Sequence, residues 1–231
     1  MSGSCLQSEG ISDAQGRRAV ARARGGHAKG SRSHLLGGIA LLLIGLAVVG
    51  SDARAACHKA LVVVDVQKLY LSRATWLTSD GKGLVAKIEP LLLAARENGI
   101  PVIYVQHVNN PGISPDSSLV GFADAIAPKD GELVVQKLFP SGFQGTTLQA
   151  ELEARGITDL IVTGLSSVGC VDATIKAALS LGFSVTVIAD AHAAADSVPV
   201  TSGQNDVWKA LGATIVWSNA IDFATLCPKR S

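Results

Sequence analysis

Charged residues are scarce in this sequence, and no basic stripe follows residue 55. Charged residues make up 17% of the 231 residues and hydrophobic residues 48%. A chain this apolar can bury a core, so its composition excludes a disordered protein. From Ala56 onward, 13 Lys or Arg stand against 16 Asp or Glu, and a mildly acidic domain lacks the basic surface that nucleic-acid binding requires. We therefore expect one globular domain with no nucleic-acid partner.

The sequence also lacks the cysteine, histidine and glycine patterns of common cofactor sites. Its four cysteines form no CxxC pair and its five histidines are scattered, so no zinc pattern is present. No GxGxxG motif follows an apolar run, which argues against a bound nucleotide. We expect neither a metal ion nor any other cofactor.

The first 55 residues differ in kind from the rest. Residues 1–34 are rich in Gly, Ser, Ala and Arg, and residues 35–50 (LLGGIALLLIGLAVVG) carry no charge. Ala53 and Ala55 supply the small residues that a signal peptidase reads, and the apolar run is shorter than the ~20 residues that span a bilayer comfortably. We predict a signal peptide within residues 1–55 and an exported, periplasmic or secreted domain at residues 56–231. The alternative is an uncleaved leader that anchors the domain to a membrane.

Three cysteines remain once this leader is set aside. Cys57 and Cys227 lie near the two ends of the domain, and domain ends are often close together, so these two could pair in an oxidising compartment. That pairing would leave Cys170 free. Cys170 is then either a small buried side chain or a reactive thiol.

Six apolar runs alternate with segments of helical character. The runs cover residues 60–65, 100–105, 132–137, 159–164, 184–190 and 213–218. Helices are predicted at 83–98, 147–155 and 171–181, with a short one at 119–126 and the close of another at 207–211. Apolar strands without polar alternation, separated by amphipathic helices, are typical of a parallel sheet covered on both faces. We predict an α/β domain with a doubly wound, mostly parallel six-stranded sheet, a Rossmann-like three-layer arrangement.

Three of the apolar runs lead to a reactive side chain at or just past their ends. These side chains are Asp65, Lys137 and Cys170. Taken singly, Asp65 could be a turn cap, Lys137 a surface charge and Cys170 a small buried residue. The carboxyl ends of parallel strands meet at one sheet edge, where ligands bind and perturbed groups gather. We therefore predict that the three side chains share one site.

Three sequence blocks around these residues resemble the isochorismatase-like cysteine hydrolases, which include nicotinamidases and carbamoylsarcosine amidases. The blocks are LVVVDVQ (61–67), VVQK with SGFQGT (134–137 and 141–146) and TGLSSVGCVDATIKAA (163–178). The likeness runs from about residue 59 to residue 194 and keeps the family's order of blocks. It implies an isochorismatase-like fold and an Asp65, Lys137 and Cys170 catalytic triad. It also implies an oxyanion hole of the Ser166 and Cys170 amides beside a cis Leu165–Ser166 bond.

The residue types suggest how such a triad would work. Cys170 at the start of a helix, near the Lys137 ammonium, predicts a lowered thiol pKa and a thiolate nucleophile. Asp65 would accept the thiol proton, pass it to a leaving amine and then activate the water that hydrolyses the thioester. The oxyanion would bind to the Ser166 and Cys170 amides.

The rest of the pocket is less closely determined. Candidate lining residues are Gln67, Tyr70, Trp76, His107, Phe139 and Phe143. The aromatic candidates could equally cover the sheet edge or a subunit interface, and a single His in such a place is often structural. Residues 66–83 hold no His and only one acidic residue, Asp80, so the metal site of nicotinamidases is not expected. Asp190 and His192 form another acid–histidine pair, to which the resemblance gives no catalytic role.

We predict a hydrolase that cleaves a small amide or related C–N bond through an acyl intermediate on Cys170. Its partner is a small-molecule substrate, and the resemblance implies a homo-oligomer, a dimer or tetramer. Two alternatives stay open: a non-catalytic binding or thiol redox module on the same fold, and an isochorismatase-type vinyl ether hydrolase that does not use the thiol. The sequence does not name the substrate.

Overall fold

The computed structural model describes residues 57–72, 81–194 and 201–227. The predicted leader and Trp76 lie outside these residues. Within them a six-stranded sheet has the order β3-β2-β1-β4-β5-β6, and every neighbouring pair of strands is parallel. The strands are β1 (Lys59–Val64), β2 (Val102–His107), β3 (Leu133–Lys137), β4 (Asp159–Leu165), β5 (Ser184–Ala193) and β6 (Thr214–Val216). This confirms the predicted doubly wound fold.

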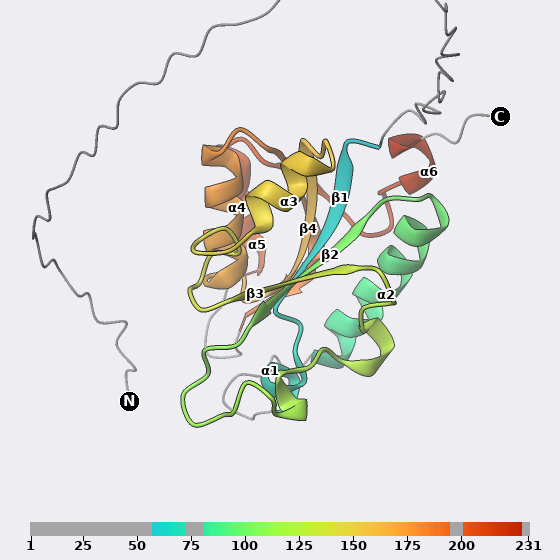
Figure 1. Cartoon of the computed structure of the whole chain (residues 1–231). Coiled ribbons are helices and arrows are strands. Elements are labelled where there is room, and N and C mark those ends of the chain that lie inside the picture. Colours follow the sequence, from blue (N-terminus) through green and yellow to red (C-terminus); the bar gives the residue numbers. More distant parts are fainter. Residues whose placement is uncertain (1–56, 73–80, 195–200, 228–231) are drawn as a thin grey trace, which may run out of the picture. The chain divides into compact units, whose positions relative to one another are not determined.

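Helices cover both faces of the sheet (Figure 1). One face carries α2 (Gly81–Glu97) and α6 (Phe223–Leu226), and the other carries α3 (Leu148–Ala154), α4 (Cys170–Ser180) and α5 (Thr201–Ala210). A short helix α1 (Lys68–Ser72) follows β1, and two single 3₁₀ turns, η1 (Ser118–Val120) and η2 (Asp124–Ile126), precede β3. The sequence pattern did not predict α1 or α6, which are too short to show a helical period, and it started β2 two residues early.

Strand β1 shows why the core has two halves. All residues from Ala60 to Val64 are fully buried, but they alternate between the two helical layers. Ala60, Val62 and Val64 pack with α3, α4 and α5, whereas Leu61 and Val63 pack with α2. Successive side chains of a strand point to opposite faces, so a continuous apolar run is what a doubly covered central strand needs.

The strand order reverses between β1 and β4, and the ends of these two strands approach closely. Gly164 near the end of β4 has φ +128°, and a Cβ placed there would lie 2.1 Å from the Val64 carbonyl oxygen. Only glycine permits this contact. The chain therefore brings the residues that follow β1 and β4 together at the switch point, where such sheets bind ligands.

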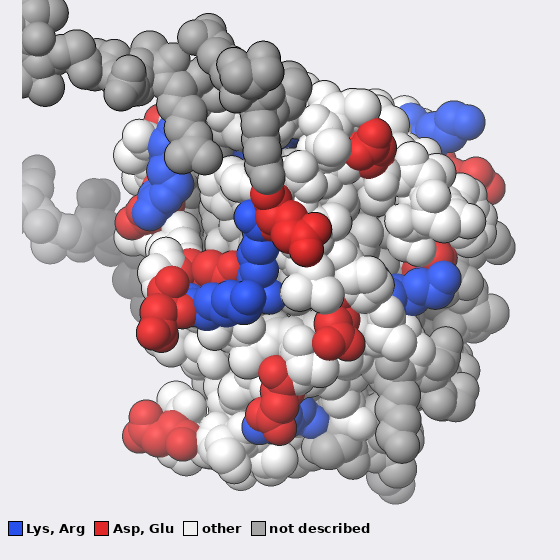
Figure 2. All heavy atoms as spheres, turned by 90° about the vertical axis from the view of Figure 1, so that its right-hand side faces the viewer, with Lys and Arg blue, Asp and Glu red and all other residues white. Residues whose placement is uncertain are grey.

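The described residues include no helix with the length and apolar character needed to cross a bilayer. Figure 2 shows the side of the domain that carries α2, where acidic and basic side chains are interspersed.

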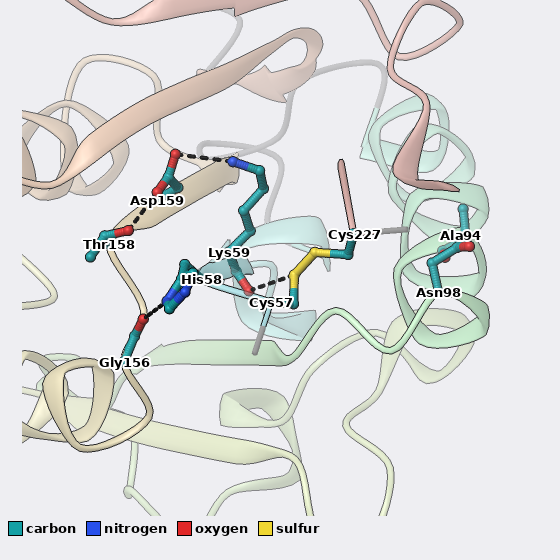
Figure 3. The surroundings of a disulfide bond; sticks show 9 residues. All are labelled: Cys57, His58, Lys59, Ala94, Asn98, Gly156, Thr158, Asp159 and Cys227. Carbon is teal, nitrogen blue, oxygen red and sulfur yellow. Dashed lines mark hydrogen bonds and ion pairs between the residues drawn. A yellow bond between two sulfur atoms is a disulfide. The ribbon is translucent and has the colours of Figure 1, made fainter. Parts of the chain in front are cut away.

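Cys57 and Cys227 form a disulfide that ties the two ends of the described domain together (Figure 3). Their Cα atoms are 5.5 Å apart and 170 residues apart in sequence. The pairing that the sequence left open is therefore present, and Cys170 remains a free thiol.

Removing this disulfide should destabilise the protein markedly, because it closes a long loop in the unfolded chain. We expect a Cys57→Ser/Cys227→Ser variant to lose about 2–5 kcal/mol of unfolding free energy in urea titrations. A Cys170→Ser variant, which keeps the disulfide, serves as the matched control. An unchanged urea midpoint for the double variant would show that the bond contributes nothing to stability.

Candidate active site

Asp65 directly follows β1 and turns back into the protein. Its φ of 52° lies in the left-handed region, which non-glycine residues rarely adopt. Its amide donates to the Val105 carbonyl at 2.9 Å, and its own carbonyl accepts from the Gln67 amide at 2.8 Å. The side chain is 2% exposed. The turn therefore holds a carboxylate in the interior at the end of the sheet.

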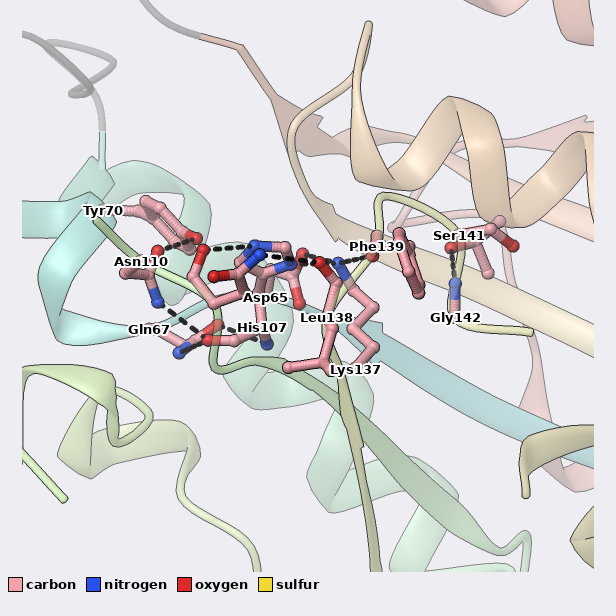
Figure 4. A network of polar contacts seen from close by, with 12 residues as sticks. Asp65, Gln67, Tyr70, His107, Asn110, Lys137, Leu138, Phe139, Ser141 and Gly142 are labelled. Atoms are coloured by element: carbon pink, nitrogen blue, oxygen red, sulfur yellow. Dashed lines mark hydrogen bonds and ion pairs between the residues drawn. The ribbon is translucent and has the colours of Figure 1, made fainter. Parts of the chain in front are cut away.

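Lys137 is the last residue of β3, and its side chain is completely buried. Its Nζ lies 2.7 Å from Oδ2 of Asp65 (Figure 4). The alternative of a surface charge is wrong, because this ammonium lies inside the domain and is paired. A buried charge needs such a partner, so each of the two ions accounts for the position of the other.

The Lys137 ammonium lies close to three groups that can accept a hydrogen bond. Besides Asp65, it contacts Nδ1 of His107 at 3.1 Å and donates to the Phe139 carbonyl at 3.2 Å. An ammonium has three N–H groups and accepts nothing, so Nδ1 of His107 must be the acceptor. His107 is then neutral, with its Nε2 hydrogen directed to the Asn109 carbonyl at 3.1 Å. Burial and the Lys137 charge both lower the pKa of His107, which agrees with a neutral ring.

Cys170, the first residue of α4, lies against this charged pair. Its Sγ, one carboxylate oxygen of Asp65 and one ring nitrogen of His107 all lie within 4.8 Å of one another. The structure thus brings together the three residues predicted to form the triad and adds His107 beside them. These residues come from four different strand ends of one sheet edge.

The expectation of a lowered Cys170 pKa is wrong. Burial, and then the negative charge of Asp65, raise the pKa of the Cys170 thiol to about 12, and the Lys137 charge only partly opposes them. Lys137 was expected to stabilise a thiolate, but its charge is paired with Asp65, whose own negative charge disfavours a thiolate. The resting nucleophile is therefore a neutral thiol, which needs a base at the moment of attack. Burial also raises the pKa of Asp65, although Lys137 opposes this, and a carboxylate with a raised pKa is a stronger base.

The loop between β4 and α4 supplies backbone N–H groups next to the thiol. The Leu165–Ser166 peptide bond is cis, as the resemblance implies. The Gly169 and Val171 amides both donate to the Ser166 carbonyl, at 2.9 and 3.1 Å. Within the part of the chain described, the Ser166 and Cys170 amides make no backbone hydrogen bond in this loop. The loop thus leaves available the two donors predicted for an oxyanion hole.

The remaining pocket candidates occupy different places. Gln67 is fully buried, and its side-chain amide bonds both the N–H and the carbonyl of His107 and the Val120 carbonyl, so it holds the end of β2 in place. The sequence alone does not show whether a glutamine after a strand faces a pocket or forms hydrogen bonds with buried backbone groups. Phe143 is half-buried against Phe183, so it covers the sheet. Phe139 is exposed beside Lys137.

Tyr70 is the candidate whose hydroxyl lies in the electrostatic field of the triad. Burial, and then the charges of Asp65 and Cys170, raise the pKa of Tyr70, which keeps its hydroxyl protonated. The hydroxyl donates to Oδ1 of Asn110 at 2.7 Å (Figure 4). Asn110 was not predicted, because it lies in an irregular loop where no periodicity identifies it. Its own amide holds the His107 carbonyl at 3.0 Å.

Asp65, His107 and Cys170 also have the donor atoms of a metal site. The Lys137 ammonium lies within hydrogen-bonding distance of two of these three residues. A metal ion on the same donors would have to bind next to an existing positive charge. The residues present therefore fit an ion pair better than a metal ion.

Comparisons with known proteins identify the family to which this fold belongs. The model of the isochorismatase domain matches residues 59–217. The chain is 32% identical to the ureidoacrylate amidohydrolase RutB of Stutzerimonas stutzeri over 177 residues, covering 60% of this chain and 71% of that protein. It is 36% identical to the streptothricin hydrolase of Streptomyces noursei over 140 residues, covering 60% and 50%.

A solved structure shares the fold closely. The N-carbamoylsarcosine amidase of Thermoplasma acidophilum superimposes with a TM-score of 0.64 at 28% identity. The match covers 71% of this chain and 98% of that one. The likeness therefore includes nearly all of the solved chain.

Proposed function

The chain belongs to the isochorismatase family, and on that basis we propose that it hydrolyses a small amide or related C–N bond by acyl transfer to Cys170. One observation supports this most strongly: the buried Asp65 and Lys137 ion pair lies directly against a free, uncharged thiol. The names of the amidohydrolase and amidase relatives support the choice of bond.

The first half-reaction forms the thioester. Sγ of Cys170 attacks the carbonyl carbon of the substrate while its proton passes to the Asp65 carboxylate. The Ser166 and Cys170 amides receive the negative charge that develops on the substrate oxygen. The C–N bond then breaks, and the leaving nitrogen takes the proton back from Asp65. Lys137 keeps the carboxylate ionised before the attack and again after the proton has passed to the leaving nitrogen.

The second half-reaction releases the acid. Asp65 removes a proton from a water molecule, and the resulting hydroxide attacks the thioester carbon. The C–S bond breaks, and Cys170 regains a proton from Asp65 as the thiol. Over the two half-reactions Asp65 thus takes up and gives back a proton twice, which suits a carboxylate whose raised pKa brings it nearer to neutral pH.

Two features favour the enzyme over a thiol redox module. A thiol that only senses or pairs does not need a general base beside it, whereas hydrolysis through an acyl intermediate does. In addition, the disulfide of the described domain joins Cys57 and Cys227 and leaves Cys170 unpaired. A vinyl ether hydrolase that ignores the thiol would not need Cys170.

We also propose that the protein works outside the cytoplasm. Stable disulfides form mainly in oxidising compartments. The Cys57 and Cys227 bond, together with the apolar run at residues 35–50, supports export.

A substrate screen tests the proposed activity. The purified protein should release ammonia or amine from at least one member of a panel of small amides, ureido acids and N-carbamoyl amino acids. A Cys170→Ala variant should release none. If the whole panel is inert while an isochorismate-type vinyl ether is cleaved, the C–N assignment is wrong.

A further inference from the structure

His192 is a buried histidine that the proposed reaction does not use. It lies near the end of β5, is 3% exposed, and has a hydrogen-bond partner on each ring nitrogen. Nδ1 lies 2.9 Å from the Ser167 hydroxyl, and Nε2 lies 2.9 Å from Oδ1 of Asn205 on α5. Burial lowers the pKa of His192, so the ring is neutral.

The direction of these bonds can be assigned. The Asn205 side-chain nitrogen donates to the Ala189 carbonyl at 3.1 Å, so its oxygen faces His192. Nε2 of His192 must then carry the hydrogen, and Nδ1 must be an acceptor. The Ser167 hydroxyl therefore donates to His192. Asn205, His192 and Ser167 form a chain of hydrogen bonds with one fixed polarity.

Ser167 links this chain to the loop that carries the oxyanion amides. It directly follows Ser166, is fully buried, and donates its own amide to the Ala193 carbonyl at 2.8 Å. The last residues of β4, just before this loop, also bond or pair with β5. The Thr163 hydroxyl donates to the Ala191 carbonyl, and Gly164 pairs with His192.

The pairing of β5 with β4 is irregular here, which shows that the end of β5 is realigned onto this loop. Val162 pairs with Val187, but two residues later Gly164 pairs with His192. β5 thus contains more residues than β4 between these two pairs. Because of these extra residues, His192 pairs with Gly164 and lies next to the loop that follows β4.

The other side of His192 is fixed by α5 and α4. The Trp208 ring packs edge-on against the imidazole, with 4.8 Å between ring centroids. The Trp208 indole donates at 3.0 Å to Oδ1 of Asp172, two residues after Cys170. The histidine therefore lies between the Ser166 loop and the first turn of the helix that carries the nucleophile.

We propose that His192 is a positioning residue for the oxyanion hole. Through the Ser167 hydroxyl it holds the Ser166 amide in place, and Asn205 fixes the ring in the tautomer that this requires. This inference rests on the proposed acyl transfer to Cys170. The alternative is that His192 only satisfies hydrogen bonds in the core.

Two reactions of Cys170 distinguish these roles. Acetylation by p-nitrophenyl acetate passes through a tetrahedral oxyanion, whereas alkylation by iodoacetamide does not. A residue that positions the oxyanion hole should affect the first reaction and leave the second unchanged. A residue that only stabilises the fold should affect both or neither.

The test compares Ser167→Ala and His192→Leu with wild type in both reactions. We expect the acetylation rate constant, measured from the p-nitrophenolate burst, to fall about 10- to 100-fold in each variant. The iodoacetamide rate should stay at the wild-type value. Ser218→Ala is the matched control, because it also removes a serine hydroxyl bonded to β5, in this case to Asp190 at 2.7 Å, away from the loop. It should leave both rates unchanged.

The outcomes separate the two proposals. If wild type is not acetylated on Cys170, the proposed function fails before any variant is considered. If wild type reacts but folded Ser167→Ala keeps the full acetylation rate, the positioning role is refuted while the function stands. A parallel loss of alkylation would also refute it, since the thiol itself would then be displaced. Should His192→Leu not fold, Ser167→Ala decides alone.

Discussion

Replacing Cys170 by alanine should abolish amide hydrolysis, with kcat/KM falling by about 10⁴-fold or more, the scale seen when a covalent nucleophile is removed. The side chain is small and only partly buried, at the first residue of α4, so the fold should tolerate the change. Activity would be followed as product release from the amide found in the substrate screen. Far-ultraviolet circular dichroism would show that the variant is folded.

A matched control lies on the same helix. Ser180→Ala alters the last residue of α4, where the exposed hydroxyl donates to the Ala177 carbonyl of its own helix. It should retain wild-type turnover. Full activity of Cys170→Ala would instead support a hydrolase that ignores the thiol.

Replacing Asp65 by asparagine should have two opposite effects on Cys170. Turnover should fall about 10²- to 10⁴-fold, because no carboxylate is then present to take the proton from the thiol and give it to the leaving nitrogen. Alkylation by iodoacetamide at mildly alkaline pH should become faster, because the Asp65 charge raises the thiol pKa. In wild type, with a thiol pKa of about 12, the alkylation rate should keep rising with pH without a plateau below that value.

Lys137→Met serves as the control of opposite sign. The Lys137 charge lowers the thiol pKa, so its loss should slow alkylation over the same pH range. Both variants leave a buried charge unpaired, and each should also lower the unfolding free energy by about 3–5 kcal/mol in urea titrations. Slower alkylation in Asp65→Asn would contradict the assigned electrostatics.

Much of this site could be predicted because strand ends in a parallel sheet share one edge. The apolar runs located all six strands, and the reactive residues at their ends, Asp65, Lys137 and Cys170, then had to lie near one another. The places of Cys57 and Cys227 at the two ends of the domain made their pairing possible, and the structure shows it. These inferences need only the order and polarity of the elements.

Other features depend on contacts that no local pattern contains. The sign of the Cys170 pKa shift depends on how deeply the thiol is buried and on how far Asp65 neutralises Lys137. The role of Gln67 depends on which backbone groups it meets. The contact of His192 with Ser167 arises from an irregular pairing of β5 with β4, and regular strand spacing does not predict it.

Locating the acyl group during turnover tests the proposed mechanism most directly. The protein would be mixed with p-nitrophenyl acetate, quenched in acid during the burst, digested and analysed by peptide mass spectrometry. If Cys170 is the nucleophile, one acetyl group should be found on the peptide that contains Cys170, and it should be lost on longer incubation before the quench. Hydrolysis of the ester with Cys170 unmodified throughout would contradict the proposed mechanism.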